Sequence, residues 1–112
     1  MLSNHISYVE FKAKDLEAIE QFYTEAFGWQ FTSYGPTYIS FSESGIAGGF
    51  ELTNEEVINS VLVVLYHSDL EGIKDKVKAC GGAIVKDIFS FPGGRRFEFL
   101  DPSGNQLAIW SE

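Results

Sequence analysis

The sequence predicts an α+β fold in which one βαβββ module occurs twice. A tight turn followed by a strand, Asp101–Trp110, has a degenerate earlier copy in Ser42–Glu51. Each half also alternates apolar and polar residues with period two before it changes to a helical spacing. Two such modules side by side would form a curved eight-stranded mixed sheet around a cup, with the helices outside. The length of 112 residues favours a single domain, 1–112, with a core of its own.

The first module covers residues 1–53 and begins with a strand and a helix. Ile6–Ala13 alternates polar and apolar residues as a half-buried strand does. Asp15 suits the N-cap of the helix, and Gly28 suits a left-handed cap at its end. Between them, apolar residues recur at helical spacing: Leu16, Ile19, Phe22, Tyr23 and Ala26.

Three further strands complete the first module, at Trp29–Tyr34, Thr37–Phe41 and Ile46–Leu52. Residues 54–60 form the predicted linker. Thr53 and Glu56 have the spacing of a capping box, which allows one short helical turn there.

The second module covers residues 61–112 and repeats the order of the first. Val61–Tyr66 is a nearly continuous apolar strand, and Ser68 and Glu71 have capping-box spacing at the start of a helix. The predicted buried stripe of this helix consists of Leu70, Ile73, Val77 and Cys80. Gly81-Gly82 ends the helix, and the remaining strands are Ala83–Phe89, Arg95–Leu100 and the one after the Asp101 turn.

The two modules match by counting along the chain. Asp15 and Asp69 lie 54 positions apart, and Gly45 and Gly104 lie 59 apart. The second copy therefore gains about five residues between its strands, as expected where a repeated unit carries a longer hairpin.

Composition narrows the possible partners. The net charge of −8 argues against nucleic acid, because phosphate contacts need clustered Lys and Arg. Cys80 is the single cysteine, so no disulfide forms within the chain, and its place on the helix stripe favours a buried structural thiol. No basic leader and no apolar stretch long enough for a membrane span are present. We expect a soluble cytoplasmic protein with no membrane partner.

The motifs resemble those of the vicinal oxygen chelate superfamily, the group of glyoxalases, bleomycin-resistance proteins and extradiol dioxygenases. The residues that carry the resemblance run along nearly the whole chain: Val9-Glu10-Phe11, Asp15-Leu16, Phe22-Tyr23, Phe27-Gly28-Trp29, Asp69-Leu70, Gly81-Gly82 and Asp101-Pro-Ser-Gly-Asn105. The resemblance implies the twofold βαβββ fold with a cup. It does not specify the reaction.

In metal-using members, the resemblance implies a divalent ion held by His, Glu or Gln from four strands, which would polarise the substrate as a Lewis acid. The matching positions here are Tyr8, Leu62 (or Val63 if the register slips by one), Gly49 and Ala108. Only Tyr8 is even a weak ligand among these residue types. We therefore expect no metal and no cofactor at the usual place.

The two histidines do not replace the missing ligands if strand parity holds. His5 is three residues from Tyr8 and His67 is five from Leu62, and odd separations place side chains on opposite faces of a strand. A β-bulge could reverse either, which leaves a displaced metal site open. Otherwise His5 belongs to a solvated terminus and His67 to a strand end beside the second helix.

Parity predicts which side chains face the cup: Tyr8, Glu10, Lys12, Ala47, Gly49, Glu51, Leu62, Val64, Tyr66, Gln106, Ala108 and Trp110. The small residues Ala47, Gly49 and Ala108 would leave room for a ligand, and the alternative is a core filled by aromatic side chains. Glu10 and Glu51 are the only carboxylates of this set, and Lys12 is expected to pair with Glu10. Arg95-Arg96 follows a glycine turn, where it could contact an anion or simply be solvated.

The leading hypothesis is a metal-independent protein that binds a small organic ligand, cationic or aromatic, in the cup. The ligand-binding candidates are Tyr8, Glu10, Glu51, Tyr66, Gln106 and Trp110. No catalytic residue is assigned. The alternative is a metal-dependent lyase, isomerase or dioxygenase with a non-standard metal site. By resemblance we also expect a homodimer.

Overall fold

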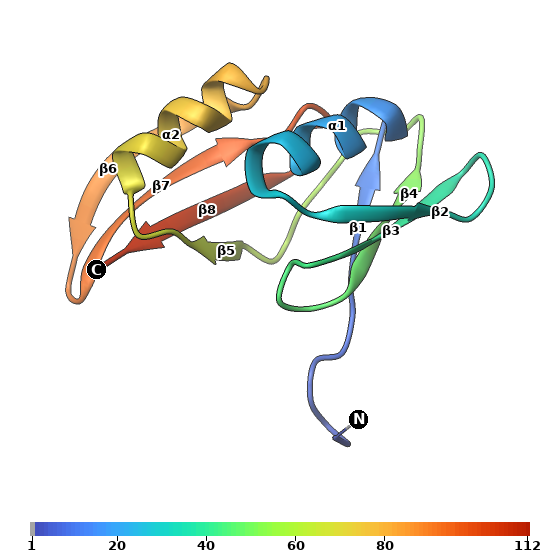
Figure 1. Ribbon diagram of the computed structural model, residues 1–112, viewed down its shortest axis with the longest axis horizontal. Helices are drawn as coiled ribbons and strands as arrows, with labels where there is room; N and C mark the ends of the chain where they lie inside the picture. The colour runs from blue at the N-terminus through green and yellow to red at the C-terminus, as the bar shows by residue number, and fades with distance from the viewer. Residues whose placement is uncertain (1) are drawn as a thin grey trace. The chain divides into compact units, whose positions relative to one another are not determined.

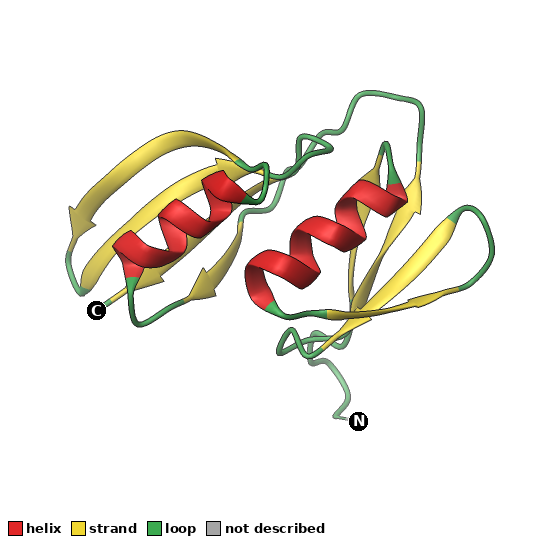
Figure 2. Ribbon diagram, turned by 45° about the horizontal axis from the view of Figure 1, so that its top comes forward, coloured by secondary structure: helices red, strands yellow, loops and turns green. Residues whose placement is uncertain are grey.

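The computed structural model describes residues 2–112 and confirms the repeated βαβββ order. The chain divides into two compact units, and the division falls between Glu56 and Val57, inside the segment predicted as a linker. In each unit one helix lies across one face of a four-stranded sheet (Figures 1 and 2).

The first unit contains four strands and one helix: β1 (Val9–Ala13), α1 (Leu16–Phe27), β2 (Gln30–Ser33), β3 (Tyr38–Ser42) and β4 (Gly48–Leu52). The strand order is β1-β4-β3-β2, with β1 parallel to β4 and the other neighbours antiparallel. Helix α1 makes the connection between β1 and β2.

The caps of α1 are the predicted ones. The Asp15 carboxylate accepts a hydrogen bond from the backbone N–H of Ala18 at 3.1 Å. Gly28 ends the helix with φ 76°, a left-handed conformation in which a residue without Cβ avoids strain. Ile19, Phe22, Tyr23 and Ala26 are buried.

Aromatic rings form the core between α1 and its sheet. The Tyr23 ring lies 4.6 Å from Trp29 and 5.2 Å from Phe50, measured between centroids. Phe11 and Phe50 stack at 5.1 Å across the β1–β4 pair. The buried residues of β1 therefore face α1, and the alternate residues of the same strand face away from it.

The second unit has the same order: β5 (Val63–Tyr66), α2 (Leu70–Ala79), β6 (Ala83–Phe91), β7 (Gly94–Leu100) and β8 (Gln106–Ser111). The strand order is β5-β8-β7-β6, with β5 parallel to β8. Its core consists of apolar side chains that are at most 3% exposed: Leu70, Ile73, Val77, Phe97, Phe99, Leu107 and Ile109.

The start of α2 corrects one prediction. Asp69, not Ser68, is the N-cap, and its carboxylate accepts from the backbone N–H of Gly72 at 3.0 Å. Because Asp15 caps α1 in the same way, the cap confirms the equivalence of the two aspartates. No helical turn forms at Thr53, whose hydroxyl instead accepts from the backbone N–H of Glu55.

The turn at Asp101 is a buried hydrogen-bond network. The Asp101 carboxylate accepts from the backbone N–H groups of Ser103 and Asn105, both at 2.9 Å, and from the Asn105 side chain. The Asn105 amide oxygen in turn accepts from Asn59, and Asn59 accepts from the backbone of Gln106. The motif thus fastens residue 59 to the first residue of β8.

Strand register settles how the modules correspond. Glu10 pairs with Gly49 in the first unit, and Val64 pairs with Ala108 in the second. If Gly49 corresponds to Ala108, then Tyr8 corresponds to Leu62, and the alternative position Val63 is wrong. Among residues 2–112, no helix is long and apolar enough to cross a membrane.

Candidate functional site

Each sheet has a second face, which points away from the helix of its own unit. The α1-distal face carries Tyr8, Glu10, Lys12, Tyr38, Gly49 and Glu51. The α2-distal face carries Leu62, Val64, Tyr66, Lys86, Phe89, Arg96, Glu98, Gln106, Ala108 and Trp110. The six predicted ligand-binding residues divide equally between these two faces.

Two phenols and a carboxylate form a chain of hydrogen bonds on the α1-distal face. The hydroxyls of Tyr8 and Tyr38 lie 2.5 Å apart, and the Tyr38 hydroxyl donates to Glu10 at 3.1 Å. Burial raises the pKa of Tyr38, and the hydrogen bonds to Tyr8 and Glu10 raise it further. Tyr38 is therefore a neutral donor, and it links two residues that the sequence predicted separately.

Tyr38 itself was missed by the sequence analysis. The signal was present, because Tyr38 and Ser40 alternate along β3 with the buried residues Ile39 and Phe41. Alternation places Tyr38 on the α1-distal face, and the register places it opposite Glu51.

The space above Gly49 is filled, which corrects the prediction that this glycine leaves room for a ligand. A Cβ at position 49 would lie 2.5 Å from the Cζ of Tyr38 and closer still to its hydroxyl oxygen. The phenol of Tyr38 thus lies where a side chain at position 49 would stand. Ala108, the equivalent residue of the second unit, is fully buried and leaves no opening either.

Lys12 connects the two predicted carboxylates of this face. Its ammonium forms an ion pair with Glu51 and lies 4.0 Å from Glu10. The hydrogen bond to Glu51 raises the pKa of Lys12. Glu10, the partner expected from the sequence, is therefore farther from the Lys12 ammonium than Glu51 is. All three side chains are about half exposed.

Aromatic side chains dominate one end of the α2-distal face. Tyr66 and Trp110 are opposite each other in the β5–β8 pair, and their rings meet edge to face at 5.2 Å. The Tyr66 hydroxyl donates to Glu112 at 3.2 Å, and the charge of Glu112 raises the pKa of Tyr66. Tyr66 is 51% exposed, so its ring is accessible to a ligand.

A polar cluster lies beside the aromatic pair. Glu98 accepts from Arg96 and from Gln106, each at 3.1 Å, one bond to each carboxylate oxygen. Glu98 is only 12% exposed, and parity along β7 places it on this face. The prediction that Glu10 and Glu51 are the only carboxylates facing away from the helices is therefore wrong.

The adjacent arginines Arg95 and Arg96 point to opposite faces. Arg95 forms two hydrogen bonds with Glu71 of α2, at 2.6 and 3.1 Å. Arg96 lies on the α2-distal face, where its guanidinium carbon is 5.3 Å from the centre of the Phe89 ring. They therefore do not act as one basic pair.

The residues at the family's four metal positions do not fit a metal ion. Tyr8 is bonded to Tyr38, Gly49 lies under the Tyr38 ring, and Leu62 and Ala108 have no donor atoms. Glu98 lies directly opposite Ala108, but both of its oxygens already accept hydrogen bonds. Within residues 2–112, no three His, Cys, Asp or Glu side chains are grouped as a metal site.

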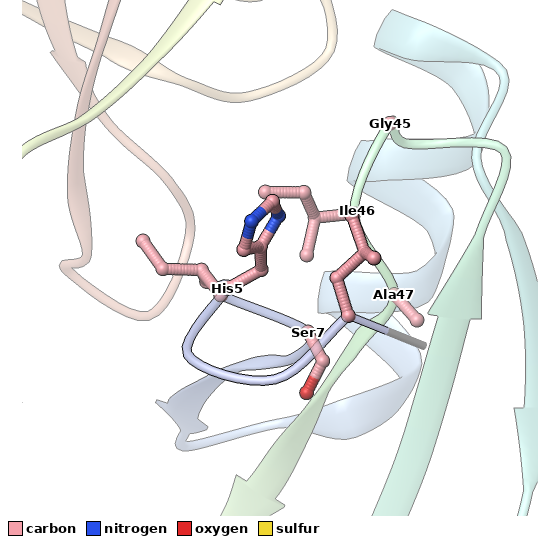
Figure 3. Close-up of a pocket in the computed structure, with 7 residues that line it drawn as sticks. His5, Ser7, Gly45, Ile46 and Ala47 are labelled. Carbon is pink, nitrogen blue, oxygen red and sulfur yellow. The ribbon is translucent and has the colours of Figure 1, made fainter.

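The histidines lie elsewhere. His5 is in a turn before β1, so strand parity does not extend to it, and it lines a shallow hollow with Ser7, Gly45, Ile46 and Ala47 (Figure 3). His67 follows β5, and its Nδ1 accepts from the backbone N–H of Asp69 at 2.9 Å. His67 thus supports the start of α2, as expected for a strand-end residue beside that helix.

Cys80 is less buried than predicted. It forms the C-cap of α2 and is only half-buried, because the helix ends there and the chain turns through Gly81.

A family model described as the Glyoxalase/Bleomycin resistance protein/Dioxygenase superfamily matches residues 5–109. A glyoxylase-like domain-containing protein from Didymella fabae is 28% identical over 121 residues, with 97% of this chain and 94% of that protein covered.

Solved structures share the fold. A glyoxalase-related enzyme from Fulvimarina pelagi superposes with a TM-score of 0.83 at 21% identity, covering 97% of this chain and 88% of that one. The fosfomycin resistance protein FosX from Listeria monocytogenes superposes with a TM-score of 0.83 at 15% identity, covering 100% and 95%. At these identities the likeness concerns the fold alone.

Proposed function

The chain belongs to the glyoxalase/bleomycin resistance protein/dioxygenase superfamily, and on that basis we propose that it binds a small organic molecule without a metal ion. The observation that carries the proposal is the α2-distal face, where an accessible aromatic pair lies beside a few fixed polar groups. Apolar walls with a small number of placed polar groups are typical of small-molecule sites.

Exposure of apolar side chains supports this role. Leu62 is 38% exposed, Val64 43% and Tyr66 51%, and all three lie on or directly before the outer strand β5. Adjacent exposed apolar residues on one strand face favour a binding surface over an ordinary solvated one.

The α1-distal face of the first unit, taken by itself, carries polar groups of a different character. Its phenol–phenol–carboxylate chain presents Tyr8, which is 46% exposed, and its ion pair holds Glu51 beside Lys12. Tyr8, Glu10 and Glu51 therefore stay in the proposal as ligand-binding candidates of the α1-distal face itself.

The absence of fitting ligands at the four family positions supports metal independence. A carboxylate or imidazole is missing from each. The carboxylate opposite Ala108, Glu98, is engaged by Arg96 and Gln106, and the carboxylate opposite Gly49, Glu10, accepts from Tyr38. We expect binding to survive complete removal of metal ions.

The test is a thermal-shift and tryptophan-fluorescence screen of the EDTA-dialysed protein against a broad panel of small organic molecules. A ligand at 100 times its Kd stabilises the folded state by about 2.7 kcal/mol, which is a readily measured rise in Tm. The substitution Trp110→Leu should weaken the ligand found. No rise with any ligand, or binding only after metal is restored, would overturn the proposal.

A second candidate function is a metal-dependent enzyme with a non-standard site. The observation in its favour is Glu98, which places a carboxylate directly opposite the metal position Ala108. Elemental analysis of the purified protein separates the two: tightly held metal near one equivalent, lost in Glu98→Gln, favours the enzyme.

We also propose that the chain forms a homodimer. The outer strand β5 and the preceding residue Val61, which is 71% exposed, leave apolar side chains that a second copy could cover. Light scattering decides the matter, because the chain has a mass of 12.5 kDa and a dimer has twice that mass.

A further inference from the structure

The Arg96 guanidinium is held in place with much of its hydrogen-bonding capacity unused. Its Nη2 donates to Glu98, and the side chain is 32% exposed. The Nε–H is buried without an acceptor, and within residues 2–112 Nη1 makes no hydrogen bond. A guanidinium has five N–H donors, so this one can still donate hydrogen bonds to a further, anionic partner.

Glu98 cannot be that further partner. Its second oxygen is taken by Gln106, and the side chain is 12% exposed. Glu98 therefore positions Arg96 and Gln106 at the surface of β7 and β8. The other nearby carboxylate, Glu112, accepts from the Tyr66 hydroxyl.

Aromatic residues lie opposite Arg96 on both neighbouring strands, β6 and β8. Trp110 lies directly opposite Arg96 in the β7–β8 pair, and Tyr66 packs edge to face on Trp110. On the other side, two cations lie over the Phe89 ring: the Arg96 guanidinium and the Lys86 ammonium, which is 4.3 Å from the ring centre. Two cations thus converge on one aromatic group.

This combination suits a ligand with a carboxylate at one end and an aromatic ring at the other. The planar guanidinium matches the geometry of a carboxylate, and two N–H groups can donate to its two oxygens. An aromatic ring gains stacking or edge-to-face contacts with Tyr66 and Trp110. The Arg96 guanidinium has no hydrogen-bond acceptor to offer a cationic ligand.

We propose that the α2-distal face selects aromatic carboxylates, with Arg96 binding the carboxylate and Trp110 and Tyr66 binding the ring. This inference rests on the proposed ligand-binding function and names its ligand class. The proposed ligand is an aromatic anion. It therefore differs from the cationic ligand, which is one of the two kinds that the sequence led us to expect.

Three matched probes test the ligand class: phenylacetate, phenylacetamide and phenethylammonium, which share the ring and differ in charge. Trp110 reports binding, whereas Trp29 is buried in the α1 core at 5% exposure and gives a constant background. We expect phenylacetate to bind at least about tenfold more tightly than either of the others.

Adjacent arginines supply the control. Arg96→Gln should weaken phenylacetate binding by about tenfold or more, whereas Arg95→Gln, on the opposite face with Glu71, should leave it unchanged. Arg96→Lys keeps a positive charge beside Glu98 and should still lose affinity, because an ammonium cannot make the planar paired contact.

The outcomes are distinguishable. Equal or tighter binding of the amide or the ammonium, or equal effects of the two glutamine substitutions, overturns the inference while the ligand-binding function stands. The same holds if none of the three probes binds but other members of the broad panel do. If nothing in that panel binds, the proposed function fails as well.

Discussion

The phenol of Tyr38 occupies the volume that a side chain at Gly49 would need. The two residues lie on neighbouring strands, and Tyr38 keeps its place through hydrogen bonds to Tyr8 and Glu10. A glycine at position 49 is therefore part of the packing of this face and not an opening in it.

Gly49→Ala should destabilise the protein by about 1–3 kcal/mol, because the new methyl group forces the Tyr38 ring out of its hydrogen bonds. Urea unfolding measures the loss. In a Tyr38→Ala background the same substitution should cost less, and equal costs in both backgrounds would contradict the packing.

The same substitution at the neighbouring residue, Gly48→Ala, should lower the free energy of unfolding more than Gly49→Ala does. Its methyl group would collide with the backbone carbonyl of Val9 and with the Phe41 ring, which is 4% exposed. A backbone carbonyl in the β1–β4 ladder cannot turn aside as the end of a tyrosine can. A smaller loss for Gly48→Ala than for Gly49→Ala would refute this ranking.

Asp101→Ala should be strongly destabilising. It removes the acceptor of three hydrogen bonds in a turn where Asp101 is 4% exposed, and each buried donor left without a partner costs about 1–3 kcal/mol. Thermal unfolding measures the effect. Asp75→Ala, on the exposed side of α2, is the control and should change Tm little.

The ion pair of Glu71 and Arg95 should make stability depend on pH in the acid range. The hydrogen bonds from Arg95 lower the pKa of Glu71 from 4.5 to about 2. A carboxylate with a lowered folded-state pKa contributes its stability above its ordinary pKa and loses it as the pH falls.

The difference in unfolding free energy between the protein and Glu71→Gln should therefore be present above about pH 4.5 and disappear as the pH falls toward 2. The difference should be small, since the pair is exposed and screened by water and salt. Denaturant unfolding across this range checks it, and a difference that grows with acid would contradict it.

Ala108→Glu should be less stable than Ala108→Gln by at least about 1 kcal/mol. Both substitutions enlarge a fully buried residue, but the glutamate also places a second carboxylate directly opposite Glu98. Chemical denaturation of the two variants measures the difference. Equal stabilities would show that Glu98 does not repel a charge at this position.

Much of the fold follows from local sequence. Period-two and helical spacings predict the strands and helices, Asp15 caps α1 as expected, and Gly28, Gly45 and Gly104 adopt the positive φ values that their turns need. Parity alone also places Tyr8, Tyr66 and Trp110 on the faces away from the helices, because successive side chains of a strand alternate.

What only the tertiary structure decided is which of these side chains meet. Three such contacts join residues of neighbouring strands: Tyr38 with Gly49, Glu98 with Gln106, and Lys12 with Glu51. Such contacts depend on strand order and register, and a pattern along one strand does not contain them. The sequence by itself determined the repeated module and the facing of its residues, and strand pairing determined the chemistry those residues can perform together.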